Sequence, residues 1–459
     1  MLKKHLVLLT ISLVMLMESV DSSIINTSIP IMAKSLHSAP LDLKLALISY
    51  LLSISIFIPI SGWMADKYGS KKVFIVAVSI FTISSLLCGF SHELSQLILF
   101  RFMQGMGSSM SLPVGRLILL RSFPRHEMIS KMSLVIIIAS LGGMMGPVIG
   151  GFISSYYSWP WVFWINIPIG IFTLFMAHFF LPSCTKKRVH HLDKPGFIMF
   201  GLALATLTFG LSSLSESFFS VQQSFIMIGV ALLLFITYGL HSRKSKYPIV
   251  NLKLFEIKTF KLSFTNNIVF RIIIGGVPFI LPLMLQIGLN YSPEGAGTFM
   301  TPIALGVLSM KIIDIYILRR FGYRQILLCN TMLIGCALAS FGFIDQHSSL
   351  LSILLRTYFF GLFMSMQYAC LNSLGYANVD EEYLSSATSI MGTIQQIGLS
   401  FGVALSAILL RASSAYFQES ADHIGMKTFH ISFFILSCLV VFLLLSLRQL
   451  SAQDGQEML

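Results

Sequence analysis

Long apolar runs, each close to the length of a membrane-spanning helix, follow one another along nearly the whole chain. A helix needs about 20 mostly apolar residues to cross the hydrocarbon core of a bilayer. Fourteen runs reach or approach this length, at residues 6–30, 45–64, 73–90, 97–120, 132–154, 162–181, 196–214, 224–240, 262–287, 296–317, 326–343, 350–374, 386–410 and 429–447. Their spacing predicts an all-α membrane protein with fourteen transmembrane helices.

The first run, which follows Lys3 and Lys4, has the outline of a secretory signal peptide. It is longer than such a peptide, contains Glu18 and Asp21, and ends without a small-residue cleavage site. We therefore interpret it as the first transmembrane helix.

Charged residues are rare and unevenly placed. They make up 11% of the chain, against roughly 25% in ordinary soluble domains. So low a share of charged residues excludes a soluble enzyme and a nucleic-acid-binding domain. Of the 31 lysines and arginines, 22 fall in loops on the N-terminal side of the membrane and four in loops on the other side. Because cytoplasmic loops are enriched in Lys and Arg, we expect both termini to be cytoplasmic. The net charge of +12 then reports orientation and indicates no nucleic-acid partner.

The longest inner loop, about 241–261, contains a proline and several charges and lies near the middle of the chain. It is either a solvated linker or a contact for anionic lipid headgroups. Residues 318–324 repeat the loop 62–72 in a weaker form, which fits two parallel halves. We predict three parts: an N-terminal six-helix half (1–181), two extra helices with the linker (182–261), and a C-terminal six-helix half (262–459).

The loop after the second run combines a carboxylate with turn glycines and cations, at Gly62, Asp66, Gly69, Lys71 and Lys72. A neighbouring helix N-terminus or a basic residue could hold Asp66. Breaking that contact would release a conformational gate. The alternative is a plain charged turn.

A second candidate site combines Arg101, inside the fourth run, with Glu18 and Asp21 in the first. A charge inside a membrane helix is costly and normally faces a partner or an aqueous cavity. Glu18 and Asp21 are three residues apart and so share one helical face. A carboxylate that alternates between Arg101 and water would have two proton affinities, as proton coupling requires. A fixed ion pair that holds the bundle together is the alternative.

The fifth run carries glycines four residues apart. Gly142, Gly146 and Gly150 form a small-residue stripe that lets two helices approach closely, and Pro147 removes a backbone hydrogen bond and bends the helix.

These motifs together resemble those of a known family. Residues 62–72 are similar to the GxLaDrxGrkxxl signature of the major facilitator superfamily, with Ser70 in place of the usual arginine. Residues 101–107 resemble its RxxQGxG motif, 142–151 its antiporter motif GxxxGPxxGG, and 21–30 the first-span motif of its fourteen-spanner drug:proton antiporters. Residues 159–170 resemble a stretch of the EmrB/QacA-type transporters, and residues 66–69 and 113–116 most resemble the MdtD-like branch.

The resemblance implies a major facilitator fold with two extra central helices. It implies a proton-coupled antiporter that exports drugs or amphipathic small molecules across the bacterial inner membrane. Asp21 and Arg101 would couple protons, and the glycine-rich motifs would act in gating. Glu18 is an addition to the family pattern, and it is either a second proton-coupling site or a contact for a cationic substrate. The proton gradient would replace any cofactor, and we expect no metal site. The expected partners are a small-molecule substrate and the lipid bilayer, with the chain a monomer. The use of a periplasmic adaptor stays open.

Charged residues within the predicted spans give an indication of the substrate class. Arg271 and Arg356 have no obvious acidic partner, and unpaired arginines favour an anionic ligand. The alternative function is therefore export of an endogenous anion, such as an organic acid, a siderophore or a metal-citrate species. The other candidate cavity residues are Asn26, Gln104 and Arg116. Backbone bonding or snorkelling would also explain the arginines. No enzyme motif is present.

Overall fold

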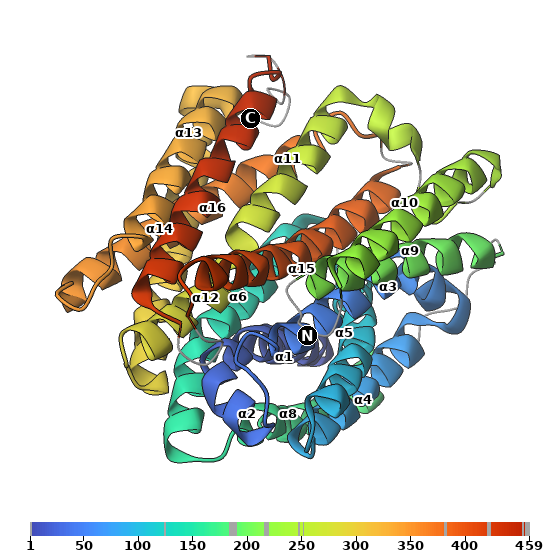
Figure 1. Cartoon of the computed structure of the whole chain (residues 1–459). Coiled ribbons are helices and arrows are strands. Elements are labelled where there is room, and N and C mark those ends of the chain that lie inside the picture. Colours follow the sequence, from blue (N-terminus) through green and yellow to red (C-terminus); the bar gives the residue numbers. More distant parts are fainter. Residues whose placement is uncertain are drawn as a thin grey trace.

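A computed structural model describes residues 2–123, 125–182, 191–214, 220–246, 248–250, 252–380, 383–419, 424–451 and 454 of the chain. In this described part all regular secondary structure is helical (Figure 1). The prediction of an all-α membrane protein is confirmed, and each of the fourteen predicted runs lies in a helical segment.

The first six runs form the N-terminal group of helices. The helix α1 (Leu2–Ile24) continues through the turn η1 (Ile25–Thr27) into α2 (Ile29–Ser35). The others are α3 (Lys44–Tyr68), α4 (Ser70–Gly89), α5 (Leu94–Ser122), α6 (Arg125–Tyr156), α7 (Trp161–Trp164) and α8 (Asn166–Phe180).

The remaining eight runs form the later helices of the chain. They are α9 (Lys194–Ser213), α10 (Val221–Lys244), η2 (Leu252–Glu256), α11 (Lys258–Gly275), α12 (Val277–Leu283), η3 (Met284–Gly288), α13 (Pro293–Phe341), α14 (Leu350–Leu374), α15 (Leu384–Tyr416) and α16 (Met426–Leu447). The element α13 contains two predicted runs. The chain turns between them at Gly322, whose backbone is not helical (φ 70°, ψ 165°).

Thirteen helical segments of the described part are long and apolar enough to cross a membrane. The helix α5 is not among them; besides Arg101, Arg116 and Arg121 it contains several serines, glutamines and glycines. Its 29 residues nevertheless span about 44 Å at 1.5 Å per residue. With α5, the helices account for all fourteen predicted spans.

Early helices pack mainly on early ones and late helices on late ones. The N-terminal group contains the pairs α1–α6, α3–α5 and α4–α5, and the C-terminal group the pairs α13–α14, α11–α15 and α13–α16. Figure 1 shows these groups in blue to cyan and in yellow to red. They meet where α3 packs on α15 and α6 on α13, and α9 contacts both α3 and α15. The division at residues 181 and 261 stays a prediction.

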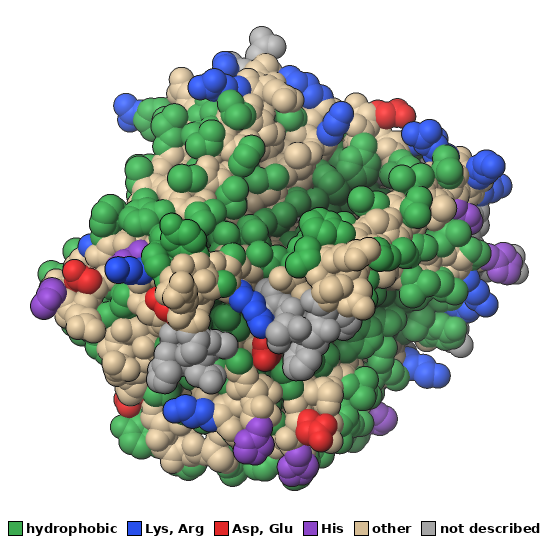
Figure 2. All heavy atoms as spheres, viewed as in Figure 1, with side chains coloured by type: hydrophobic (Ala, Val, Ile, Leu, Met, Phe, Trp, Pro, Cys, Tyr) green, Lys and Arg blue, Asp and Glu red, His purple; other side chains and the backbone are tan. Residues whose placement is uncertain are grey.

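The molecular surface fits a lipid environment. Large apolar side chains are exposed along α10, including Phe225, Ile226, Leu232, Leu233 and Ile236. Figure 2 shows broad hydrophobic areas, with many of the visible Lys and Arg side chains along the upper and right margins.

Candidate functional site

An ion pair between Asp21 on α1 and Arg101 on α5 lies at the centre of the N-terminal helices. Arg101 Nη1 is 2.7 Å from Asp21 Oδ2, and both residues are fully buried. The sequence prediction that Arg101 needs a carboxylate partner from the first span agrees with this geometry. Inside a membrane a partner of this kind offsets the high cost of burying a charge.

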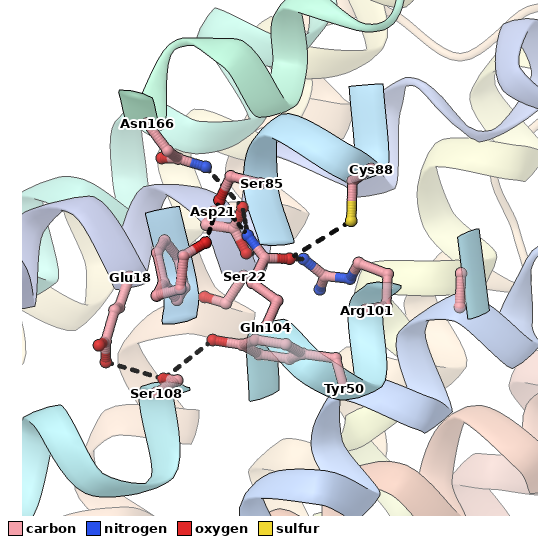
Figure 3. A network of polar contacts seen from close by, with 12 residues as sticks. Glu18, Asp21, Ser22, Tyr50, Ser85, Cys88, Arg101, Gln104, Ser108 and Asn166 are labelled. Carbon is pink, nitrogen blue, oxygen red and sulfur yellow. Dashed lines mark hydrogen bonds and ion pairs between the residues drawn. The ribbon is translucent and has the colours of Figure 1, made fainter. Parts of the chain in front are cut away.

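The second carboxylate oxygen of Asp21 accepts hydrogen bonds from two side-chain amides. Gln104 Nε2 donates to Asp21 Oδ1 at 2.9 Å, and Asn166 Nδ2 donates to the same atom at 2.7 Å. Gln104 also accepts from Arg101 Nη1 at 2.6 Å and donates to Ser85 Oγ at 2.7 Å. Figure 3 shows this network, in which residues of α1, α4, α5 and α8 converge on one carboxylate.

Glu18 does not share this pair, although the sequence placed it on the same helical face as Asp21. Its carboxyl oxygens contact the hydroxyls of Ser108 (2.8 Å) and Ser111 on α5. Tyr50 of α3 donates to Ser108 Oγ at 3.1 Å, and the ring of Tyr50 lies 4.1 Å from the guanidinium carbon of Arg101. Tyr50 therefore connects Ser108, the contact of Glu18, with Arg101, the partner of Asp21 (Figure 3).

Sequence reasoning missed several members of the network. Asn166 lies in a tryptophan-rich stretch, and tryptophans of this kind are typical of the membrane–water interface. The stretch therefore gave no reason to predict a role for the Asn166 amide. A single amide at the start of an otherwise apolar helix is a usable signal, because such groups hydrogen-bond across helices. Serines carry little signal of this kind. Ser85, Ser108, Ser111 and Tyr50 could be found only from the structure.

The predicted glycine stripe of α6 lies against α1. A β-carbon at Gly146 would be 1.9 Å from Ser23 Oγ, and one at Gly150 would be 2.2 Å from the carbonyl oxygen of Ile24. At Gly142 the nearest atom would be the carbonyl oxygen of Leu16, at 2.7 Å. Pro147 accepts a hydrogen bond from Thr27 Oγ1 at 3.2 Å. The two helices are therefore in backbone contact over two turns.

The predicted gating turn joins α3 to α4. Asp66 Oδ1 pairs with Arg121 Nη2 at 2.7 Å, so a basic residue holds this carboxylate. Gly69 has φ 92°, a backbone conformation that favours glycine. Lys71 donates to the carbonyl oxygen of His178 at 2.6 Å. Gly62 and Lys72 are exposed, and a β-carbon at Gly62 would meet nothing within 4 Å.

The candidate cavity residues lie in different places. Gln104 belongs to the Asp21 network, and Asn26 is buried in η1. Arg116 is exposed on α5.

Arg271 and Arg356 differ sharply. Arg271 is buried on α11, where its Nε donates to Asn267 at 3.2 Å and its guanidinium carbon lies 4.2 Å from the centre of the Tyr368 ring. Arg356 donates to the backbone carbonyl of Ser340 at 2.6 Å and lines a pocket of about 520 Å³ between α13 and α14. The structure does not bring these two arginines together.

Ionisable groups paired inside membrane helices mark ion and substrate pathways. With its many membrane-length helices and its buried charge network, the molecule belongs to the class of membrane transport proteins. Comparison with known families makes this specific. The chain matches the Major Facilitator Superfamily over residues 11–403. It belongs to that family, whose members are transport proteins and not enzymes.

Curated relatives support the predicted branch. The chain is 35% identical over 394 residues to "Putative multidrug resistance protein MdtD" of Pectobacterium carotovorum, covering 86% of this chain and 84% of the relative. It is 32% identical to "Probable transport protein HsrA" of Haemophilus influenzae over 97% of this chain and 96% of that protein. The resemblance to the MdtD-like branch is thereby confirmed.

Solved structures share the fold at low sequence identity. A D-xylose-proton symporter superposes with a TM-score of 0.71 at 14% identity, over 99% of both chains. A bacterial homolog of the human lysosomal transporter Spinster gives a TM-score of 0.69 at 14% identity, over 97% of both chains. At this identity the likeness confirms the major facilitator fold and carries nothing about substrate.

Proposed function

We propose that this transporter is a proton-coupled antiporter that exports drugs or amphipathic small molecules across the bacterial inner membrane, with both termini in the cytoplasm. The observation that carries the proposal is the buried Asp21–Arg101 pair. When Asp21 takes up a proton, its attraction to Arg101 is lost, and the guanidinium group is free to take another partner within the N-terminal group of helices. Loss of the proton restores the pair.

The groups around the Asp21–Arg101 pair favour an ion pair that changes during transport over one that only holds the helices together. Arg101 Nε and Asn166 Oδ1 are buried and have no hydrogen-bond partner in the described part of the chain. A purely structural network is expected to satisfy all its buried polar atoms. The spare donor and the spare acceptor leave room for a second arrangement of the same groups.

Inside-out membrane vesicles with an acidified lumen provide the test. We expect the wild-type protein to drive ethidium uptake and to dissipate the proton gradient when ethidium is added. Asp21→Asn should abolish the gradient-driven uptake while the protein still reaches the membrane. The control is Asp42→Asn, which changes a half-buried aspartate near the start of α3 and should transport normally.

Undiminished uptake by Asp21→Asn would contradict proton coupling at this residue. If the wild-type protein moves ethidium without a proton gradient, antiport itself is wrong.

One observation supports a second candidate function, the export of an anionic metabolite or metal chelate. Arg271 is buried, and no carboxylate of the described chain lies within ion-pair distance of it. A buried guanidinium of this kind can recognise a carboxylate with two parallel hydrogen bonds. In the same vesicles, citrate would replace ethidium, and Arg271→Gln should lose citrate uptake while Arg271→Lys retains part of it.

We further propose that the protein works as a monomer in the bilayer, driven by the proton gradient without a cofactor, and has no nucleic-acid partner. Involvement of a periplasmic adaptor forms no part of the proposal.

A further inference from the structure

Glu18 is a buried acid whose surroundings differ from those of Asp21. Only 4% of its surface is exposed. Its two carboxyl oxygens contact hydroxyl groups, those of Ser108 and Ser111. No Lys, Arg or His of the described chain forms an ion pair with it.

The neighbouring elements add no positive charge that is free to compensate Glu18. From α5, Arg101 is committed to Asp21, and from α3 the nearby ionisable group is Tyr50. The helix α6 presents glycines to α1, and α8 presents the neutral Asn166. On its own helix, the charged group three residues away is Asp21, which would repel an ionised Glu18; Lys4 is more than three turns away. An ionised carboxylate buried without a counter-charge is strongly disfavoured and takes up a proton instead.

The hydrogen bonds around Glu18 can be satisfied with one additional proton. Tyr50 donates to Ser108, and Ser108 donates to Glu18 Oε2. Ser111 Oγ lies 3.3 Å from the carbonyl oxygen of Gly107 and 3.2 Å from that of Ser108, and either can accept its only hydrogen. The Ser111 hydroxyl is placed to donate to Glu18 Oε1. With its hydrogen turned to either carbonyl oxygen it accepts from a protonated Oε1 instead, so the same contacts accommodate the neutral acid.

We infer that Glu18 is a second proton-binding site, protonated at neutral pH in this conformation and separate from the Asp21–Arg101 pair. Its proton resides on Oε1 and is donated to Ser111 Oγ. The inference rests on the proposed proton coupling only for the use made of this proton, since protonation itself is measurable without any substrate. The chain Glu18–Ser108–Tyr50 reaches the face of Arg101, so direct contacts connect the two sites.

Infrared spectroscopy of the purified full chain in detergent tests this inference. A protonated carboxyl group has a C=O stretch that ionised carboxylates lack. We expect the wild-type protein at pH 7 to show such a band and to lose it reversibly at alkaline pH. At pH 7, Glu18→Gln should lack the band and Asp21→Asn should retain it. Glutamine keeps the shape and the hydrogen-bonding capacity of the side chain, so the variant should fold.

The matched control is Glu93→Gln. Glu93 also contacts a serine hydroxyl, that of Ser95 at 3.2 Å, but its side chain is exposed to solvent. Its replacement should leave the band unchanged. A band that survives Glu18→Gln would overturn the inference, and so would a Glu18 band that persists at every pH at which the protein stays folded. Failure of ethidium or citrate transport would overturn the proposed function and leave the infrared result intact.

Discussion

At the scale of single residues, the charges in the first and fourth spans show what a sequence can reveal. A charge in a membrane helix needs a partner, so the pairing of Arg101 with an acid of α1 could be predicted. The choice between Glu18 and Asp21 could not, because it depends on how α1 is rotated against α5. Serines occur throughout the apolar helices, so nothing in the sequence distinguishes Ser108 and Ser111 as the contacts of Glu18.

Asn166 yields a prediction at this scale. Its amide donates to Asp21 Oδ1 at 2.7 Å from the first turn of α8. Asn166→Leu keeps the approximate shape and removes the donor, so we expect a loss of about 1 kcal/mol in stability. The thermal unfolding midpoint of the purified protein measures this loss. Thr173→Val on the same helix is the control, because Thr173 Oγ1 is buried without a partner in the described chain. Equal midpoints for the two variants would refute a supporting role for Asn166.

At the scale of helices, apolar length predicted the spans well, and the departures have local causes. The helix α5 is a span despite its three arginines, since Arg101 is paired inside the protein and Arg121 pairs with Asp66. Gly69 and Gly322 both have positive φ values, 92° and 70°, where α3 gives way to α4 and where α13 turns. The weak sequence repeat of these two loops thus corresponds to a shared backbone conformation.

The glycine stripe of α6 allows a prediction with an internal control. Gly150→Ala would place a β-carbon 2.2 Å from a backbone carbonyl oxygen of α1, which cannot move without shifting the helix. We expect a destabilisation of roughly 1–3 kcal/mol, the usual range for overpacking. Gly143→Ala, on the same helix, meets nothing within 4 Å and should be neutral or slightly stabilising. Thermal unfolding of both variants gives the comparison, and a stable Gly150→Ala protein would mean that α1 and α6 are not in backbone contact.

At the scale of the whole molecule, the two groups of helices touch closely near the ends of α1, α6 and α12. Gln286 Nε2 donates to the carbonyl oxygen of Thr27 at 3.0 Å, and the backbone N–H of Glu294 donates to Ser155 Oγ at 3.3 Å. At Gly151 of α6 and Gly297 of α13 the backbones are so close that neither position has room for a β-carbon. By the predicted topology these contacts close the outer side. Their partners are more than 100 residues apart, so no local pattern in the sequence indicates them.

Alternating access requires these outer contacts to break while each half stays intact. In a chain whose six native cysteines are replaced, a cross-link between Ser155→Cys and Glu294→Cys would join α6 to α13. It should stop transport of whichever probe, ethidium or citrate, the wild-type vesicles move, and reduction should restore transport. The control pair, Ser28→Cys with Ser154→Cys, replaces two hydroxyls that lie 2.7 Å apart within the predicted N-terminal half. Cross-linking this pair should leave transport largely unchanged, because residues of one rigid half do not separate. If the control cross-link also stopped transport, the N-terminal helices would not move as one body, and the predicted division into two halves would be wrong.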